Sequence, residues 1–174
     1  MEIHRITSTG DALFTEAMRL YAESFPAHEQ REAPSQRRIL GESAYHFNAV
    51  CDNGEFIGEA LCWEVGEFLY IEHLCVLPSM RNRGYGQKIL DALRNTPLIL
   101  EIDPPVDAIS MRRKGFYERC GFVANPYRHV HPPYHKGNHG HELVVMSRPR
   151  MLTDGEYDRF RRYLQDTVMH HAFE

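Results

Sequence analysis

Two arginines and two glycines that follow an apolar segment have the chemistry of a phosphate site. Residues 68–77, FLYIEHLCVL, are almost wholly apolar and predict a central strand covered on both faces. Pro78 ends this strand, and residues 87–95 continue with apolar positions at helical spacing. Glycines allow a tight turn that points backbone N–H groups at an anion, and a helix N-terminus beside arginines adds positive charge. We therefore expect a diphosphate to contact Arg81, Asn82, Arg83, Gly84, Tyr85 and Gly86.

Two common nucleotide-binding patterns do not fit this loop. The P-loop pattern ends in Gly-Lys followed by Ser or Thr, whereas Gly86 is followed by Gln87 and Lys88. The Rossmann pattern needs three glycines near the start of a βαβ unit, and only Gly84 and Gly86 occur here. The loop therefore indicates a diphosphate site of another kind.

The segment VLPSMRNRGYG, residues 76–86, resembles the V-x-P-x-x-R-x-x-G-x-G pattern of the GNAT superfamily, the acyl-CoA-dependent N-acyltransferases. Residues 117–122, YERCGF, are similar to the Y-x-x-x-G-F segment of the same family, and they follow in the order that its layout implies. The resemblance implies an α/β (α+β) GNAT fold with a mixed central sheet, splayed strands four and five, helices on both faces and an extra C-terminal helix. It also implies an N-acetyltransferase that moves an acetyl group from acetyl-CoA to a primary amine by direct transfer in a ternary complex.

The same resemblance assigns cofactor contacts to the end of the apolar strand. In the family, backbone groups of strand four bind the pantetheine arm and the acyl carbonyl, and Leu74, Cys75 and Val76 occupy that stretch here. Backbone amides held in place before reaction can polarise a carbonyl. Ser110 stands where many relatives have an asparagine, and we expect it to replace the hydrogen bond of that side chain to the cofactor.

Glu72 is the only acid in the apolar strand, and we predict that it is the general base. Strand alternation places Tyr70, Leu74 and Val76 on its face, and it places His73 on the opposite face as a packed histidine. Burial should raise the pKa of the Glu72 carboxyl toward neutrality, which suits a group that accepts a proton from an amine, directly or through water. The alternative is a structural role, exposed or paired with an arginine.

Tyr117 matches the family tyrosine near the CoA sulfur, which implies that its phenol protonates the departing thiolate. The ordinary pKa values of a phenol and a thiol differ by about two units, so this transfer is chemically reasonable. The alternative is that Tyr117 only covers apolar surface. Apolar neighbours should raise the pKa of the Cys75 thiol, which disfavours a covalent acyl-cysteine.

The acceptor side is the least specified part of the sequence. Phe25 and Glu29 lie between the first two expected helices, and Tyr134 lies in a proline-rich segment. In the resembling fold such regions line the acceptor pocket, and Tyr70 on the strand could share contacts with the amine. We expect a small-molecule amine or a peptide as the acceptor, with Glu29 holding a cationic amine.

Five histidines between residues 129 and 141 raise the question of a metal site, because imidazole is a common ligand of zinc and nickel. Neither Cys-x-x-Cys nor His-Glu-x-x-His accompanies them, and their spacing fits no zinc finger. We therefore expect no physiological metal.

The expected element order around these residues is β-α-α-β-β-β-α-β-α-β-β. Residues 52–54, DNG, predict a hairpin turn, and residues 153–156, TDGE, predict the capping box of a last helix with one apolar stripe.

We divide the chain into a GNAT domain over residues 1–148 and a helical extension over residues 149–174, packed on the same domain or on the partner in a homodimer. The expected strands are 2–7, 45–51, 55–65, 68–77, 98–102, 122–130 and 142–147, and the expected helices are 11–25, 34–40, 87–95, 109–120 and one after 153.

Composition argues for one enzyme domain without membrane or nucleic-acid partners. The 174 residues suffice for one core, and 43% hydrophobic residues argue against disorder. The net charge of −4 argues against a nucleic-acid surface, and no apolar stretch reaches the length of a membrane span. The four scattered cysteines are expected to be buried thiols in a reducing cytoplasm.

A non-catalytic function is the alternative. A module with the GNAT fold could bind CoA as a sensor, or it could use the C-terminal helix to engage a protein partner. The loop at residues 81–86 argues for cofactor binding in either case, and the presence of Glu72 and Tyr117 favours the enzyme.

Overall fold

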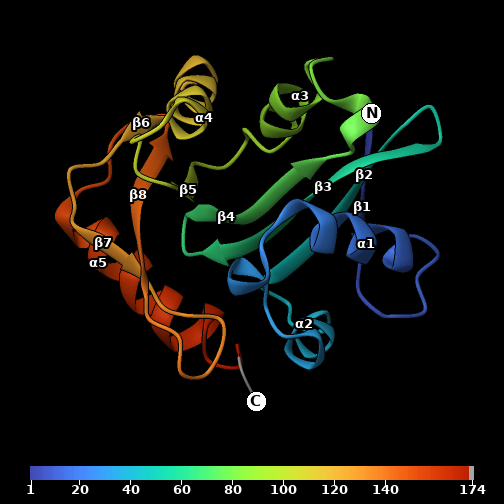
Figure 1. Cartoon of the computed structure of the whole chain (residues 1–174), viewed down its shortest axis with the longest axis horizontal. Helices are drawn as coiled ribbons and strands as arrows, with labels where there is room; N and C mark the ends of the chain where they lie inside the picture. The colour runs from blue at the N-terminus through green and yellow to red at the C-terminus, as the bar shows by residue number, and fades with distance from the viewer. Residues whose placement is uncertain (173–174) are drawn as a thin grey trace.

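One mixed sheet runs through the molecule, which a computed structural model describes over residues 1–172. Neighbouring strands follow the order β1-β2-β3-β4-β5-β8-β6, and β7 pairs with β8 (Figure 1). β4 and β5 are parallel, whereas the other pairs are antiparallel. The strands are β1 (Glu2–Ile6), β2 (Tyr45–Asp52), β3 (Glu55–Val65), β4 (Phe68–Val76), β5 (Leu98–Ile102), β6 (Val123–Ala124), β7 (His129–His131) and β8 (His141–Arg148).

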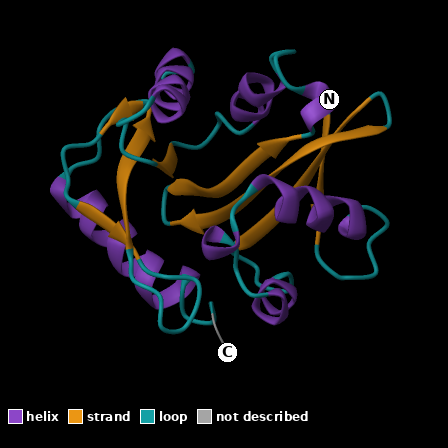
Figure 2. Ribbon diagram, viewed as in Figure 1, coloured by secondary structure: helices purple, strands orange, loops and turns teal. Residues whose placement is uncertain are grey.

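Helices cover both faces of this sheet, as the resemblance implied (Figure 2). Residues of α1, α2 and α5 share one buried cluster with the sheet, and residues of α3 and α4 share the other. No helix within residues 1–172 is both long and apolar enough to cross a membrane. The helices are α1 (Phe14–Ser24), α2 (Ala33–Ile39), α3 (Tyr85–Ala92), α4 (Ala108–Arg119) and α5 (Asp154–Tyr163), which continues into a π-helical turn (Leu164–Val168).

Local sequence signals account for several element ends. Asn53 and Gly54 have φ values of 51° and 81° in the turn between β2 and β3, a backbone conformation that these residue types tolerate. The predicted capping box of α5 is confirmed. The Thr153 hydroxyl accepts the N–H of Glu156 at 3.3 Å, and the Glu156 carboxylate accepts the N–H of Thr153 at 2.7 Å.

Three predicted elements are wrong in extent, and one of them is the helix expected over residues 87–95, which the structure places at Tyr85–Ala92. The helix expected from residue 11 begins at Phe14, because the Asp11 carboxylate accepts the N–H of Leu13 before the helix starts. The strand expected over residues 122–130 is two short strands, β6 and β7. Between them the Asn125 side chain donates to a carbonyl of β8 at 3.2 Å, so its own hydrogen bonds replace the regular ladder there.

The C-terminal helix packs on the sheet of its own chain. Tyr157 and Phe160 of α5 belong to the buried cluster on the side of α1, together with Leu164 and Val168 of the π-helical turn. Arg31 also donates to the Val168 carbonyl at 2.7 Å. The expected apolar stripe is therefore buried within the chain. The domain boundary at residue 148 and the homodimer stay predictions, and residues 173–174 of the expected extension lie outside the described residues.

β4 and β5 separate before their carboxyl ends. Residues 69–71 pair with residues 98–100, whereas β4 continues to Val76 and β5 to Ile102. The expected splay between strands four and five is therefore present. Because open α/β sheets bind ligands at the carboxyl ends of their parallel strands, this opening is where a site is expected.

Candidate active site

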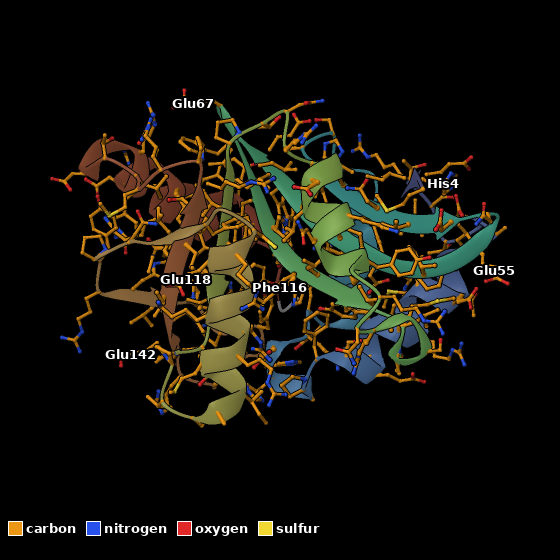
Figure 3. All side chains as sticks on the ribbon, turned by 90° about the horizontal axis from the view of Figure 1, so that it is seen from above. His4, Glu55, Glu67, Phe116, Glu118 and Glu142 are labelled. Atoms are coloured by element: carbon orange, nitrogen blue, oxygen red, sulfur yellow. The ribbon has the colours of Figure 1, made fainter. Side chains whose placement is uncertain are left out.

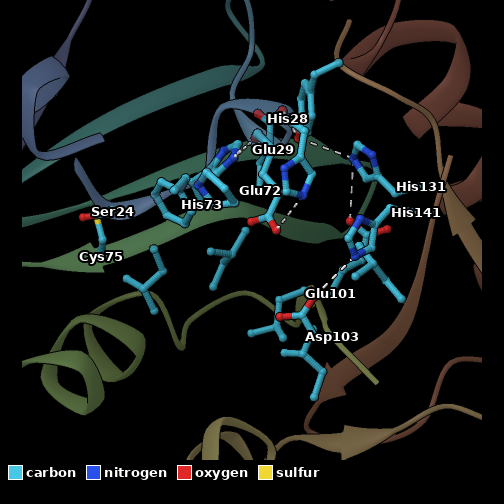
Figure 4. Close-up of a pocket in the computed structure, with 18 of the residues that line it drawn as sticks. Ser24, His28, Glu29, Glu72, His73, Cys75, Glu101, Asp103, His131 and His141 are labelled. Carbon is cyan, nitrogen blue, oxygen red and sulfur yellow. Dashed lines mark hydrogen bonds and ion pairs between the residues drawn. The ribbon is translucent and has the colours of Figure 1, made fainter. Parts of the chain in front are cut away.

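A cavity of about 590 Å³ occupies the opening between the carboxyl halves of β4 and β5. Its walls come from these two strands, from the segment after α1 and from the segments around β7 and β8 (Figure 4). The cavity also reaches Arg113 and Tyr117 on α4. It thereby brings together most of the predicted site residues, namely Phe25, Glu29, Tyr70, Glu72, Leu74, Cys75, Val76, Arg81, Tyr117 and Tyr134.

The glycine loop lies at the end of β4, next to this cavity. Arg81 lines the cavity and donates from Nε to the Val76 carbonyl at 3.1 Å. Asn82 and Gly84 have φ values of 61° and 77°, and these left-handed turns lead directly into α3. Left-handed backbone turns ahead of a helix N-terminus orient N–H groups toward an anion. Residues 82–86 do not line the cavity, so their contacts with a diphosphate stay a prediction.

The start of α3 packs closely against α4. A Cβ on Gly86 would lie 3.1 Å from Cζ of Phe116, whose ring lies between the two helices (Figure 3). Ser110 lies in the first turn of α4, where its hydroxyl completes a capping box with Asp107. Ser110 is buried and does not line the cavity. The structure thus gives Ser110 a capping role, and its contact with a cofactor stays a prediction.

Tyr117 lines the cavity and has an uncommitted hydroxyl. Its ring packs edge-on against Phe116 and Phe122, with centroid distances of 5.1 and 5.6 Å. Burial raises the pKa of the Tyr117 phenol to about 12, so the phenol keeps its proton at neutral pH. No group within residues 1–172 forms a hydrogen bond with this hydroxyl. A phenol in this state can donate a proton to a bound group.

Glu72 is a fully buried partner of Arg31. Its carboxylate accepts hydrogen bonds from the Arg31 guanidinium at 2.9 Å, the Tyr134 hydroxyl at 2.9 Å and the Trp63 indole at 2.7 Å. Burial by itself would raise the pKa of Glu72, but the charge of Arg31 and these hydrogen bonds lower the pKa to about 2. The expected raised pKa is therefore wrong, because the paired cation outweighs the effect of burial.

A β-bulge in β4 changes which side chains share a face. The register between β3 and β4 shifts by one residue and leaves Glu72 as the extra residue on β4. Beyond the bulge, Leu74 and Val76 pack in the cluster under α3, whereas the His73 ring packs 5.0 Å from that of Tyr21 on α1. The faces expected from strict alternation are therefore wrong for His73, Leu74 and Val76.

Three predicted acceptor residues form a mainly aromatic wall of the cavity. The Phe25 ring packs 4.6 Å from the ring of His73. The hydroxyls of Tyr70 and Tyr134 are both buried, and each donates to a carboxylate, Tyr70 to Glu101 and Tyr134 to Glu72. These contacts fix the two rings in the cavity wall.

Glu29, Asp103 and His141 meet at the edge of the cavity (Figure 4). One ligand atom of each lies within 4.8 Å of the other two, which is an arrangement that can hold a cation. Arg113 already pairs with Asp103 at 2.6 Å, and His28 lies 3.5 Å from the Glu29 carboxylate. Burial, and then the Asp103 charge, raise the pKa of Glu29. The acids have partners within the chain, and the expected lack of a metal stays a prediction.

The cysteines are free thiols. Cys62, Cys75 and Cys120 are buried as predicted, and Cys51 is half-buried. Cys75 lines the cavity and donates its thiol hydrogen to Glu59 at 3.3 Å. Burial raises the pKa of the Cys75 thiol far above its usual value. Because only a thiolate is an effective nucleophile, these values disfavour a covalent acyl-cysteine.

Sequence reasoning missed residues that the fold brings from distant segments. Arg31 pairs with Glu72 across 41 positions, and no spacing pattern reports such a pair. Glu101 and Asp103 at the end of β5, and His131 on β7, also line the cavity. A signal existed for the two acids, because polar residues at the carboxyl end of a parallel strand often face a ligand.

Comparisons with known proteins point to the same family as the sequence motifs. A family profile of acetyltransferase (GNAT) domains matches residues 43–124. The solved structure of a GNAT-family protein from Bacteroides thetaiotaomicron aligns over 97% of this chain and 98% of its own, with a TM-score of 0.90 and 30% identity. This chain belongs to the GNAT family. The predicted family and fold are thereby confirmed.

Other acetyltransferase structures share the GNAT fold at lower identity. One from Bacillus subtilis in complex with CoA has a TM-score of 0.56 and 15% identity, covering 84% of this chain and 96% of its own. One from Elizabethkingia anophelis with acetyl-CoA bound has a TM-score of 0.55 and 15% identity, covering 84% and 95%. Among curated proteins, none matches the chain.

The GNAT profile covers the residues predicted to bind the donor better than those predicted to bind the acceptor. Residues 43–124 include β4, the glycine loop and Tyr117. Phe25, Glu29, His131 and Tyr134 fall outside this range. Family membership therefore bears on the donor side of the site, and the acceptor has to be argued from the geometry of this chain.

Proposed function

We propose that this GNAT chain is an acetyltransferase that moves the acetyl group of acetyl-CoA to a primary amine by direct transfer in a ternary complex. One observation carries the proposal. A single cavity joins Arg81 at the glycine loop, the free end of β4, the uncommitted Tyr117 hydroxyl and a rim of acids. The solved acetyltransferases with CoA or acetyl-CoA bound support the donor.

In the proposed complex, the donor lies along the splayed strands. The glycine loop and the N-terminus of α3 bind the diphosphate, with Arg81 and Arg83 adding charge. The pantetheine arm follows Leu74, Cys75 and Val76. Backbone N–H groups of this stretch polarise the thioester carbonyl, because they are fixed before the reaction begins.

Acetyl transfer then needs one bond made, one bond broken and two proton movements. The neutral amine nitrogen attacks the thioester carbon, the C–S bond breaks, and its electron pair leaves on the CoA sulfur. Tyr117 gives its proton to that thiolate, because Tyr117 lines the cavity and its uncommitted phenol carries a proton at neutral pH. The amine nitrogen loses a proton as the amide forms.

The acceptor lies at the other end of the cavity in this proposal. Phe25, Tyr70 and Tyr134 supply aromatic surface, and the Glu29 carboxylate supplies negative charge near the rim. Such a site suits an amine attached to an apolar or ring-shaped body, in a small molecule or at the end of a peptide. Glu72 stays ionised and holds Tyr134 in place, which makes it a positioning residue here in place of the predicted base.

The experiment that tests this function measures thiol release from acetyl-CoA against a panel of polyamines, amino sugars, amino acids and peptides. We expect amine-dependent CoA release together with a product heavier by one acetyl group. Tyr117→Phe should lower turnover by about 10²-fold or more with little change in acetyl-CoA affinity. Acetyl-CoA binding without turnover on any amine would favour the non-catalytic sensor, and equal turnover of Tyr117→Phe and the parent would remove Tyr117 as the acid.

A further inference from the structure

A second buried carboxylate, that of Glu101, lies beside the acceptor end of the cavity. Its side chain is 5% exposed, and it contacts two histidines of β7 and the Tyr70 hydroxyl. The His129 imidazole forms a hydrogen bond with one oxygen, and Nε2 of His131 lies 3.9 Å from the other. Figure 4 shows Glu101 and His131 facing each other within the cavity lining.

The contacts of His131 fix its tautomer. Nδ1 lies 2.6 Å from the Pro132 carbonyl oxygen, and a carbonyl oxygen can only accept a hydrogen bond. Nδ1 must therefore carry the hydrogen. In the neutral ring Nε2 then has a lone pair, and it lies between the Glu101 carboxylate and the Tyr134 hydroxyl, 3.4 Å away. An imidazole oriented in this way is a proton acceptor with a carboxylate ready to stabilise the imidazolium.

His131 differs from the other candidate bases in the hydrogen bonds that its proton-accepting atom, Nε2, already makes. The Glu72 carboxylate accepts three hydrogen bonds and holds a proton poorly. His129 contacts Glu101 and Tyr157 but does not line the cavity. His131 does line it, and the hydroxyl nearest its Nε2, that of Tyr134 at 3.4 Å, donates its hydrogen to Glu72 at the shorter distance of 2.9 Å.

We propose that His131 is the proton acceptor for the acceptor amine and that Glu101 is its positioning carboxylate. This inference rests on the proposed acetyl transfer and deepens it. As the amine nitrogen bonds to the acetyl carbon, its N–H bond breaks and the proton goes to Nε2 of His131, directly or through one water. Glu101 stays ionised beside the resulting imidazolium. The thiolate takes its proton from Tyr117, and exchange with solvent then returns a proton to Tyr117 and removes the one on His131 before the next turnover.

The charged and titratable groups around His131 come from several elements. Glu101 lies on β5, Glu72 and His73 lie on β4, and Tyr134 lies in the segment after β7. Glu72 reaches His131 only through the Tyr134 hydroxyl. His141 of β8 is the register partner of His131 and lines the same cavity. Any change in the pH dependence of the rate must be compared with these five groups.

The test compares two histidines on the same strand. His131→Asn keeps an amide N–H near the position of Nδ1, where it can still reach the Pro132 carbonyl, but it removes the lone pair of Nε2. His129→Gln is the matched control, because it keeps a donor toward Glu101 and changes a buried histidine that does not line the cavity. Thermal unfolding of both variants controls for folding.

We expect His131→Asn to lower kcat by about 10²- to 10⁴-fold with little change in KM for acetyl-CoA, and to remove the acid limb of the kcat profile. Added imidazole should restore part of the rate. His129→Gln should lose less activity and keep the acid limb. If His131→Asn keeps the parent's kcat and acid limb, or if His129→Gln loses both as fully, His131 is not the base.

A second measurement does not depend on turnover. ¹⁵N NMR of the ring nitrogens distinguishes the two neutral tautomers, and we expect His131 to be protonated at Nδ1. Protonation at Nε2 in the neutral ring would overturn the assignment even if no amine in the panel is acetylated. Acetyl transfer by the parent that survives in His131→Asn would overturn this inference alone, and the acetyltransferase function would stand.

Discussion

Two buried glutamates show how differently one side chain type behaves in this molecule. Glu72 pairs with Arg31, and its pKa is lowered to about 2. Glu59 is 0% exposed, and burial raises its pKa to about 8. Within residues 1–172 its one hydrogen-bond partner is the Cys75 thiol, and its other Oε atom has no partner there. Burial raises the pKa of a carboxyl group, and a neighbouring cation lowers it. The two shifts have opposite signs because only Glu72 has such a cation.

These shifts predict opposite pH dependence of the free energy of unfolding. The folded pKa of Glu72 is below its usual value of 4.5, so its contribution is present above pH 4.5 and is lost as the pH falls toward about 2. The folded pKa of Glu59 is above 4.5, so stability is lost as the pH rises from 4.5 toward about 8.

Glu72→Gln and Glu59→Gln therefore form a matched pair of variants. Glu72→Gln should cost about 3–5 kcal/mol at neutral pH, because it leaves the Arg31 guanidinium buried without a counter-charge. Glu59→Gln should be more stable than the parent at neutral pH, with a melting temperature higher by about 2–4 °C or more. Urea unfolding over a range of pH measures both, and a Glu72→Gln variant as stable as the parent would contradict the ion-pair account.

At the scale of single residues, sequence reasoning identified residues that line the cavity but not their protonation states or orientations. Glu72, Tyr117 and Tyr134 do line the cavity. The raised pKa expected for Glu72 failed because Arg31 comes from a loop 41 residues away, and no periodic pattern links the two positions. The orientation of His131 depends on the carbonyl of Pro132, which only the folded backbone reveals.

At the scale of elements, the bounds of strands with a continuous apolar pattern were predicted well. The bounds of β3 and β5 match the expected 55–65 and 98–102, because turn residues limit these strands on both sides. The bulge at Glu72 was not predictable, because alternation assumes a regular ladder and a single extra residue inverts every later side chain.

The glycine loop gives a prediction at this scale. Gly84 has φ of 77° with nothing within 4 Å of an added Cβ, and Gly66, in the turn between β3 and β4, has φ of 60° with equally open space. Alanine at either position should cost about 1–2 kcal/mol of backbone strain. Only Gly84→Ala should also weaken acetyl-CoA binding, because only that turn shapes the proposed diphosphate site.

Acetyl-CoA titrations of both alanine variants, beside thermal unfolding, separate strain from binding. Equal loss of stability with a weaker affinity for Gly84→Ala alone is the expected pattern. If both variants bind acetyl-CoA as the parent does, the loop at residues 81–86 does not hold the diphosphate.

At the scale of the whole molecule, the two sides of the cavity differ in how they are built. The proposed donor side comes from one continuous stretch, β4 with the glycine loop, and from α4. The proposed acceptor side is assembled from the segment after α1, the end of β5 and the segments around β7 and β8. Contiguous motifs made the first predictable from sequence. The second depends on chain segments up to about a hundred residues apart, which only the fold brings together.

The C-terminal helix connects to this arrangement through Arg31. The same guanidinium contacts Glu72 beside the cavity and the Val168 carbonyl in the π-helical turn after α5. The extension thereby supports the residue that holds the acceptor wall in place. A role in packing its own domain explains the apolar stripe of α5 without a partner chain.

Binding of acetyl-CoA is the most direct test of the account, because every proposed step begins with the donor in the cavity between β4 and β5. Isothermal titration of acetyl-CoA into the pure protein should show one site per chain with a dissociation constant on the order of micromolar. Arg81→Ala should weaken that binding. No binding at any accessible concentration would contradict the assignment of the cavity, and the proposed acetyl transfer would fall with it.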